Sequence, residues 1–396
     1  MFDSLCDEQR VANAVELIKE ISGQAYWLDE YIALGYGFSR VGMFEESERA
    51  LEATLPHLPP VEQRTAQIID RLATAKLHLW KIDEGATLEK LIHGRDWHQV
   101  RSDMPDDQRA VFNRLFREKL LTDENSVDGK AIFFLGCGGF GDQVEQYRNI
   151  ERLLAEGASV VFADPPAPLT HLLASSSLPV VVQQSTAENL SRCDALAFGN
   201  MLNWRYRHSR LSAIPGAGYL KPVRKSGLSL PLPQTPAKRK VGIVWRSDNA
   251  SCRHEPFRSM ELATLQPLLQ QAGVQFYSLQ FGALRDAEED RLTRSGVIDL
   301  SPRIHTFLDM AELMMQLDLV VTIDSAPAHV AGALDVPVWN MLARVADWRW
   351  EQPGLKNTAL YPSMRLFRQQ ELGDWGPVVS DVITALGDVE GANRAQ

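Results

Sequence analysis

Cysteine is scarce in this sequence, and long apolar runs are absent. The four cysteines stand at positions 6, 137, 193 and 252, so no two have the CxxC spacing of zinc or redox sites. No apolar run approaches the roughly 18 residues that a membrane span needs, and the N-terminal residues are acidic where a leader would be apolar. These absences argue against a zinc site, a disulfide framework and a membrane span, and they predict a cytoplasmic protein.

Positive charge is also in deficit. The 41 lysines and arginines face 51 aspartates and glutamates, which gives a formal net charge of -10. A surface of this kind does not favour broad binding of nucleic acid or anionic lipid, although a local basic patch can still bind phosphate. We therefore expect no nucleic acid partner.

What is present is the composition of an ordinary globular chain, with 45% hydrophobic and 23% charged residues. Such a composition excludes an intrinsically disordered or low-complexity protein. At 396 residues the chain exceeds the size at which a single core usually keeps growing, so we expect two or three domains.

The first part of the chain, from Asp7 to Leu121, has apolar residues at the three- and four-residue intervals of helices. Between Tyr31 and Pro59 the large and small residues follow the spacing of a tetratricopeptide unit. Residues 65–91 have the right length for a degenerate second unit, with a turn expected at residues 83–85. An ordinary helical bundle without repeat ancestry is the alternative.

The pattern changes at Lys130 to that of an open parallel sheet. Strands are expected at residues 131–135, 158–163, 178–182 and 195–198, with a helix between the first two that ends at Ala155. Residues 221–240 then contain four prolines and six basic residues but no acidic one, which is typical of an extended linker. A domain boundary is expected there.

A second alternation of strands and helices follows the linker. Strands are expected at 241–245, 275–280 and 319–323, and helices at 259–271 and 307–316. Ligands of such sheets bind where strands end and loops begin. The loops after Leu135, Trp245, Gln280 and Ile323 are therefore the candidate sites.

The first of these loops runs from Gly136 to Asp142 and fits the pattern G-x-G-x-x-G after a strand and before a helix. Its glycines allow close backbone approach, and the helix start attracts an anion. With Asp164 at the end of the next strand, the loop is typical of an NAD(P)-dependent oxidoreductase. Tight helix packing is the alternative reason for the glycines.

Asp142 itself is either a helix cap or a general base that takes a proton from an acceptor hydroxyl.

Two later loops are suited to anions. The loop after Trp245 carries Arg246, Arg253 and Arg258, whose guanidinium groups fit a diphosphate, and Ser259 is a candidate cap for the helix that follows. A solvated loop with internal ion pairs is the alternative. The loop after Ile323 places Ser325 before a helix of small residues, with His329 one turn into it.

Taken together, these segments resemble a known family. Residues 324–339, then 347–350, 361–369 and 373–375, are similar to bacterial tetratricopeptide-repeat glycosyltransferases related to the heptosyltransferase superfamily, of the family 9 type. They are more distantly similar to the catalytic half of the protein O-GlcNAc transferases. The resemblance covers most of residues 129–380 and is densest from Val241 onward.

The resemblance implies an α/β protein of the GT-B fold, with two Rossmann-like domains facing a cleft behind an all-α, tetratricopeptide-like domain. The expected units are residues 1–128, the acceptor domain 129–237 and the nucleotide-sugar donor domain 238–396. It implies an inverting sugar transfer from a nucleoside diphosphate sugar, with no metal and no cofactor beyond that substrate. The acceptor is expected to be a protein or a glycan, and the helical domain is expected to bind a partner or to self-associate.

The resemblance also implies roles for particular residues. Asp142 would be the general base, with Gly139 and Gly141 in the acceptor-side loop. The donor would be bound by the other candidate residues, which are Arg253, Arg258, Gln280, Asp324, Ser325, Ala326 and His329.

One loop departs from the family pattern. Residues 252–259 keep only the final Arg-Ser of the related sequences, so a repeat scaffold with a degenerate transferase half remains an alternative to the enzyme. Residues 200–219 contain a Trp-Arg-Tyr-Arg-His run. We interpret this segment as a surface helix, with part of an altered acceptor site as the alternative.

Overall fold

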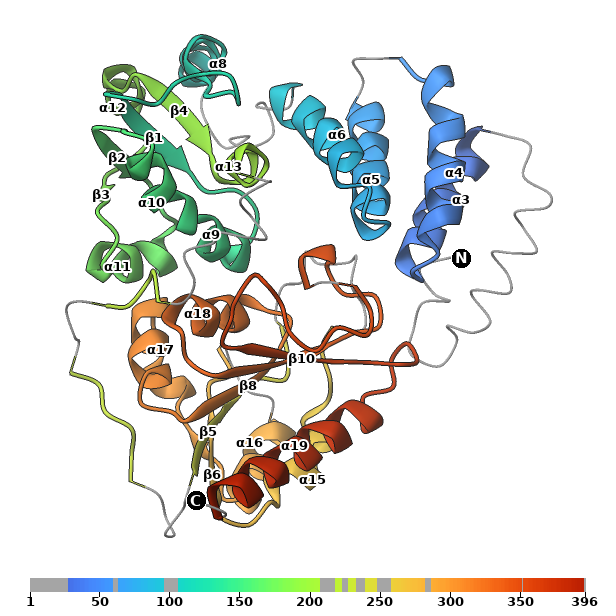
Figure 1. Cartoon of the computed structure of the whole chain (residues 1–396), viewed down its shortest axis with the longest axis vertical. Coiled ribbons are helices and arrows are strands. Elements are labelled where there is room, and N and C mark those ends of the chain that lie inside the picture. Colours follow the sequence, from blue (N-terminus) through green and yellow to red (C-terminus); the bar gives the residue numbers. More distant parts are fainter. Residues whose placement is uncertain are drawn as a thin grey trace.

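Figure 1 shows a group of helices beside one parallel sheet, with a second parallel sheet below both. This computed structural model describes residues 28–59, 63–95, 106–206, 218–222, 227–232, 239–247, 258–281, 286–350 and 352–394. The helical prediction for residues 7–27 lies outside these ranges, as do parts of the predicted linker.

The helical group consists of two helix pairs. In the first pair α3 (Leu28–Arg40) packs on α4 (Phe44–Thr54), which continues into the 3-10 turn η1 (Leu55–His57). In the second pair α5 (Gln63–His78) packs on α6 (Ile82–Arg95). The turn predicted at residues 83–85 was wrong, because Trp80 takes a left-handed φ of 58° and closes the turn earlier. Asp83 and Glu84 instead stand in the first turn of α6, where the helix dipole stabilises acidic side chains.

Glycines let the helices of each pair approach closely. A Cβ atom on Gly35 would lie 2.5 Å from Cδ2 of Leu51, and one on Gly85 would lie 2.6 Å from Cγ of Leu77. The hydroxyl of Ser47 also donates a hydrogen bond of 2.7 Å to the carbonyl of Gly35. An ordinary helical bundle can make the same contacts, so the tetratricopeptide interpretation stays a prediction.

Helix α8 (Asp106–Lys119) packs away from these pairs. Its Phe112 and Phe116 join a buried apolar cluster with Leu196 and Phe198 of the first sheet. Helix α8 therefore covers the first sheet with its apolar face, although the predicted boundary at residues 128/129 assigns it to the helical domain. The domain boundaries at 128/129 and 237/238 stay predictions.

The first sheet has four parallel strands in the order β3-β2-β1-β4. Its strands are β1 (Ala131–Leu135), β2 (Val160–Ala163), β3 (Val181–Val182) and β4 (Ala195–Phe198). Its helices are α9 (Phe140–Gln146), α10 (Arg148–Ala155), α11 (Ala167–Ser175), α12 (Ala187–Arg192) and α13 (Gly199–Arg205). The four predicted strands are confirmed, although β3 is only two residues long.

The second sheet has six parallel strands in the order β10-β9-β8-β5-β6-β7. Its strands are β5 (Arg239–Ile243), β6 (Val274–Ser278), β7 (Ile298–Asp299), β8 (Leu319–Ile323), β9 (Val338–Leu342) and β10 (Met364–Arg368). Its helices are η2 (Leu262–Leu265), α15 (Gln266–Leu269), α16 (Asp286–Arg294), η3 (Ser301–Arg303), α17 (Phe307–Met314), α18 (Ala326–Leu334), η4 (Trp348–Trp350) and α19 (Gly376–Arg394). The prediction of two parallel α/β units is therefore confirmed.

Two details of the second unit differ from the predictions. The helix expected at 259–271 starts only at Leu262 and is divided into η2 and α15, with Pro267 near the start of the second piece. The hydroxyl of Ser259 accepts a hydrogen bond from the N–H of Ser247, 3.0 Å away, so Ser259 joins two loop segments and does not cap the helix.

The surface interpretation of the run after Asn200 was wrong for its aromatic residues. Trp204 and Tyr206 are buried, with 2% and 8% of their surface exposed. Trp204 packs against the helical group, and its indole N–H donates a hydrogen bond of 2.6 Å to Glu89 of α6. Residues 207–217 of this run lie outside the described ranges.

The two sheets share one packed core. Helix α9 contacts α18, α11 contacts α17, and a single buried apolar cluster contains Phe134 of β1 and Val320 of β8. Arg148 of α10 is fully enclosed and donates a hydrogen bond of 3.1 Å to the carbonyl of Leu360 in the second unit. Within the described residues, no helix is long and apolar enough to span a bilayer.

Candidate functional site

The loops after β1, β5, β6 and β8 meet at one cavity of about 830 Å³ between the two sheets. This volume lies within the range of about 300–1,000 Å³ that is common for small-molecule sites. The cavity is lined by Gly138, Gly139, Phe140, Gly141, Asp142, Gln143, Pro166, Val244, Arg246, Ser247, Arg258, Gln280, Phe281, Phe307, Asp324, Ser325, Ala326, Pro327, His329, Asp347 and Arg349.

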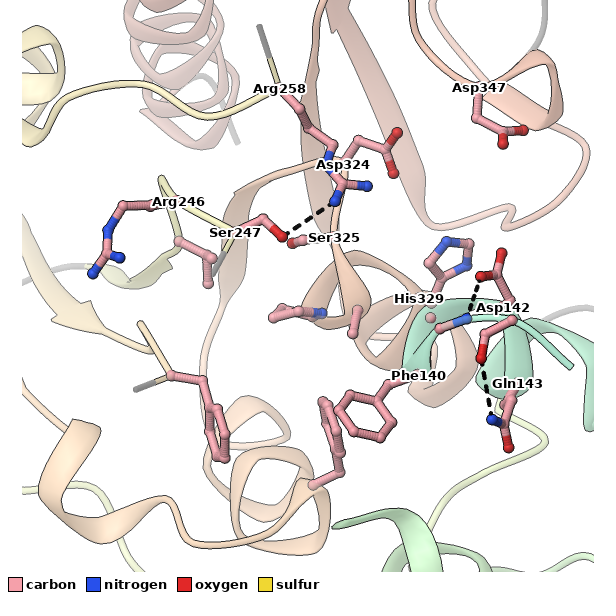
Figure 2. Close-up of a pocket in the computed structure, with 18 of the residues that line it drawn as sticks. Phe140, Asp142, Gln143, Arg246, Ser247, Arg258, Asp324, Ser325, His329 and Asp347 are labelled. Carbon is pink, nitrogen blue, oxygen red and sulfur yellow. Dashed lines mark hydrogen bonds between the residues drawn. The ribbon is translucent and has the colours of Figure 1, made fainter. Parts of the chain in front are cut away.

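Every predicted site residue that the structure describes lines this cavity. These residues are Gly139, Gly141, Asp142, Arg258, Gln280, Asp324, Ser325, Ala326 and His329. Arg253 lies outside the described residues. Figure 2 shows Arg258, Asp324 and Ser325 toward one end of the cavity and Asp142 beside His329. Their roles stay predictions, and the contacts below define what each side chain can do.

Asp142 is both a helix cap and a wall of the cavity. Its Oδ2 accepts a hydrogen bond of 2.7 Å from the N–H of Gly139, which closes a capping box at the start of α9. Its Oδ1 forms an ion pair of 2.6 Å with Nη2 of Arg349. An ionised carboxylate has about four acceptor positions, so these two contacts leave room for a hydroxyl group of a ligand.

Arg349 is the main site residue that sequence reasoning missed. It comes from η4 of the second unit, and it reaches α9 of the first unit, where it meets Asp142 and, at 3.6 Å, Glu145. Asp347 binds the same guanidinium through Nε at 2.9 Å and Nη2 at 3.1 Å. Burial alone would raise the pKa of Asp347, but the Arg349 guanidinium outweighs burial and holds that pKa well below its usual range. Arg349 is therefore a fixed positive charge between the two units.

His329 is a buried, neutral side chain at this junction. Burial lowers the pKa of its imidazole to about 4, and the Arg349 charge acts in the same direction. Its Nδ1 lies 2.9 Å from the hydroxyl of Tyr361, and its ring packs at 4.8 Å from the ring of Trp350. At neutral pH His329 therefore brings no charge to the cavity.

Gly141 marks the closest approach of the two units. A Cβ atom there would lie 2.7 Å from Cδ2 of His329 and 3.3 Å from Cα of Ala326. We expect Gly141→Ala to destabilise the protein by about 1–3 kcal/mol, because the added methyl group forces α9 away from α18. Urea denaturation monitored by circular dichroism measures this change.

Gly387 provides a matched control for that substitution. It lies within α19, and a Cβ atom there would have no neighbour within 4 Å. Gly387→Ala should therefore stabilise the protein by about 0.5–1 kcal/mol, the usual gain for replacing a helical glycine. Equal effects of the two substitutions would show that Gly141 does not mark a tight contact.

The loop after β8 directs a helix start into the cavity. Ser325 is the N-cap of α18, but its hydroxyl donates to the carbonyl of Ile323, 3.1 Å away, and makes no cap hydrogen bond. Pro327 has no N–H, and the N–H of Ala328 donates to the carbonyl of Ser325, 3.0 Å away, so this helix start presents the N–H of Ala326 and the positive end of the helix dipole to the cavity. This end of the cavity suits an anion.

Asp324 and Arg258 form the charged end of the cavity. Asp324 is 6% exposed, and burial raises its pKa although the Arg258 charge and a hydrogen bond from Trp350 act against this. Arg258 donates a hydrogen bond of 3.2 Å to the hydroxyl of Ser247. A guanidinium group beside an uncapped helix start is a strong site for a phosphate group.

Gln280 holds two loops together. Its Oε1 accepts hydrogen bonds from the N–H groups of Trp245 (3.3 Å) and Arg246 (3.1 Å), and its Nε2 donates to the carbonyl of Arg246 (2.8 Å). With only 2% of its surface exposed, the amide has little capacity left for a ligand. Its contacts fit the positioning of the Arg246 loop better than direct binding of a donor.

Three phenylalanines form an apolar wall. The ring of Phe307 lies 5.4 Å from that of Phe140, edge to face, and 6.1 Å from that of Phe281, nearly parallel. Phe140 and Phe281 are 40% and 39% exposed. In Figure 2 Phe140 lies at the opposite side of the cavity from Arg258. The cavity therefore combines an apolar side with a charged side, as sites for nucleotides and sugars do.

Backbone N–H groups of the glycine-rich loop already donate hydrogen bonds to side chains of the protein. Besides the contact between Gly139 and Asp142, the N–H of Cys137 donates to Oε1 of Gln146, 2.9 Å away. Asp164, the expected ribose ligand, accepts hydrogen bonds from the N–H and the hydroxyl of Ser185. The carboxylate of Asp142 thus lies at the start of α9, where the pyrophosphate of a dinucleotide would need free N–H groups and a positive helix end.

Comparison with known proteins finds a family that part of the chain resembles. Residues 261–350 match the model of Glycosyltransferase family 9 (heptosyltransferase). Protein FlbA of Caulobacter vibrioides is 31% identical over 160 residues, which are 38% of this chain and 25% of that protein. The match thus spans about a quarter of the length of this curated relative.

The solved structures that the chain matches are less similar in sequence. The ADP-heptose lps heptosyltransferase II of E. coli is 15% identical, with a TM-score of 0.43 over 66% of this chain and 99% of that one. The family 9 glycosyl transferase of Veillonella parvula is 11% identical, with a TM-score of 0.42 over 63% of this chain and 88% of that one.

The family match falls on the part of the chain that builds one side of the cavity. It contains the loop from Asp324 to His329, the helix α18 and the turn that carries Arg349. This segment of the chain is thus similar to glycosyltransferase family 9 (heptosyltransferase).

Proposed function

We propose that the protein transfers a sugar from a nucleoside diphosphate sugar to an acceptor hydroxyl group, with inversion and without a metal ion. One observation carries the proposal: Arg258 and the uncapped start of α18 line the same cavity as the carboxylate of Asp142, which belongs to the other unit. A donor diphosphate and an acceptor hydroxyl can therefore meet between them.

In the proposed reaction Asp142 takes the proton of the acceptor hydroxyl. The acceptor oxygen forms a bond to the anomeric carbon while the bond from that carbon to the phosphate oxygen breaks, and the electron pair leaves with the nucleoside diphosphate. Arg258, the N–H of Ala326 and the positive dipole end of α18 stabilise the negative charge that develops on this leaving group. Donor groups fixed in advance for that charge act on the transition state more than on the bound substrate.

The family description sets the first donor to test. Family 9 is described as heptosyltransferases, so a nucleoside diphosphate heptose heads a panel of ADP-, GDP- and UDP-linked sugars. Mass spectrometry of the reaction, with measurement of the released nucleoside diphosphate, tests the proposal. Release that depends on the enzyme and on one donor supports it, and no release from any donor, with or without added acceptors, argues for the alternative of a scaffold with an inactive transferase half.

An NAD(P)-dependent oxidoreductase is supported less well. The N–H groups of Cys137 and Gly139 and the carboxylate of Asp164 all have partners within the protein, so the dinucleotide site would have to be built by breaking them. The anion-binding features of the second unit would also have no role in that reaction.

For the helical group we propose a degenerate tetratricopeptide origin and a role in binding a partner. The close helix contacts at Gly35 and Gly85 support the origin. The partner would be a protein acceptor or a second copy of the chain, and size-exclusion chromatography with light scattering of the chain alone distinguishes self-association from a monomer.

A further inference from the structure

The short turn η4 contacts all three parts of the molecule. Its three consecutive residues point to different neighbours: Trp348 to the helical group, Arg349 to α9 of the first sheet, and Trp350 into the second sheet unit.

Trp348 packs where α5 and α6 of the helical group meet α13 of the first unit. It packs against the cluster of Leu77, Ala86 and Trp204, and its indole ring is stacked on that of Trp204 at 5.7 Å and 12°. Trp204 is held in turn by Glu89 through the hydrogen bond of 2.6 Å. Burial raises the pKa of Glu89 to about 7, although the hydrogen bond from the indole N–H of Trp204 acts against this.

A second contact fixes the start of the turn. Nε2 of His78, at the end of α5, lies 3.0 Å from the carbonyl oxygen of Ala346, and Nδ1 of the same ring lies 2.8 Å from the carbonyl oxygen of Thr74. The ring also stacks on Phe44 of α4 at 4.0 Å. The helical group thus holds the turn both before and at Trp348.

On its other side the turn positions the reacting groups. Arg349 binds Oδ1 of Asp142 at 2.6 Å, and Trp350, which is 1% exposed, packs on His329 and forms a hydrogen bond with Asp324. Trp350 is thus anchored inside the second unit, whereas Arg349 reaches across to the first unit, so a displacement of Arg349 would move the contact with Asp142 first.

We propose that Trp348 is a positioning residue through which the helical group sets the placement of Arg349 and hence of Asp142. In this arrangement the helical group forms part of the transferase site, and a partner that binds it can change the rate of transfer without touching the substrates. The inference about rate rests on the proposed function, whereas the inference about placement does not.

The test compares Trp348→Phe and Trp348→Ala in the full-length chain by hydrogen–deuterium exchange without any ligand. We expect Trp348→Ala to speed exchange in the loop of residues 138–143, which lies more than 200 positions earlier in the sequence but is joined to the turn through the ion pair of Arg349 with Asp142. Trp348→Phe should keep the exchange slow.

 We expect transfer to slow by about 10- to 100-fold in Trp348→Ala, the usual effect of a small misplacement of reacting groups, while the Kd of the donor changes less than twofold.

His78→Phe is a second variant that keeps the helical group packed. A phenyl ring can still stack on Phe44, but it cannot bind the carbonyl oxygen of Ala346. We expect a smaller change in the same direction, in both exchange and rate. This variant decides the question if Trp348→Ala does not fold.

Leu51→Ala is the control. Leu51 is fully buried between α3 and α4 and has no contact with the turn among the described interactions, so its loss weakens the helical group alone. Exchange in residues 138–143 should then stay as in the unmodified chain.

The proposal is overturned if Trp348→Ala and His78→Phe leave exchange in that loop unchanged, or if Leu51→Ala speeds it equally. Absence of transferase activity in the unmodified chain would refute the proposed function alone, because the exchange result needs no substrate.

Discussion

Asp142→Asn should lower the rate of sugar transfer by about 10²–10⁴-fold, the usual contribution of a general base. The amide keeps an oxygen that can accept the hydrogen bond from Gly139, so the start of α9 stays capped. It cannot take a proton from the acceptor hydroxyl. The Kd of the donor should change little, because the proposed donor contacts come from the other unit. Single-turnover kinetics and calorimetry measure the two quantities separately.

Asp309→Asn is a matched control for the loss of a capping carboxylate. Asp309 is also the third residue of a helix, and it closes a capping box by accepting hydrogen bonds from the N–H groups of Thr306 (2.8 Å) and His305 (3.0 Å). It does not line the cavity. If both substitutions slowed transfer equally, Asp142 would act through the stability of its helix, and the assignment as a base would fail.

Arg258→Ala should weaken the binding of nucleoside diphosphates by about 10- to 150-fold. Hydrogen bonds to charged groups contribute about 1.5–3 kcal/mol each, and a tenfold change in Kd corresponds to about 1.4 kcal/mol. The loss should be much smaller for the unphosphorylated nucleoside, which has no charge for the guanidinium group to neutralise. Isothermal titration calorimetry with both ligands measures the difference.

Arg344→Ala removes a guanidinium from the same unit but outside the cavity. Arg344 forms a 3.3 Å ion pair with Glu371 in which both side chains are more than half exposed. Exposed pairs of this kind contribute little, so its removal should leave diphosphate binding unchanged. An equal loss of affinity in both variants would mean that the net charge of the unit, and not a contact with Arg258, attracts the ligand.

The sheet topology and the loops of the site could be predicted because their signals are local. Short apolar runs end at glycine-rich or small-residue loops, so β1 and β8 are readable from the sequence, and the carboxyl ends of parallel strands must lie at one edge of a sheet. The loops of Asp142 and Ser325 therefore meet as expected.

Arg349 could not be predicted, because its role depends on contacts between distant parts of the chain. Its neighbours in sequence, Trp348 and Trp350, indicate only a buried or aromatic segment, whereas its partner Asp142 lies more than 200 positions earlier. The signal that was available is the match of residues 347–350 to the family pattern, which did not by itself distinguish a site residue from a structural one.

Trp204 shows a similar limit. Its polar neighbours suggest a surface helix, but the indole ring is covered by α5 and α6, which come from a separate part of the sequence. Gln280 was correctly placed at the cavity, yet its amide is engaged by the backbone of Trp245 and Arg246, which only the strand-end geometry reveals.

The most direct test of the proposed function is calorimetric titration of the full-length chain with ADP, GDP, UDP and reduced nicotinamide dinucleotide. We expect one nucleoside diphosphate to bind, its affinity to fall in Arg258→Ala, and the dinucleotide not to compete for the site. Tight binding of the dinucleotide that is unaffected by Arg258→Ala, with no binding of any nucleoside diphosphate, would contradict the proposed function.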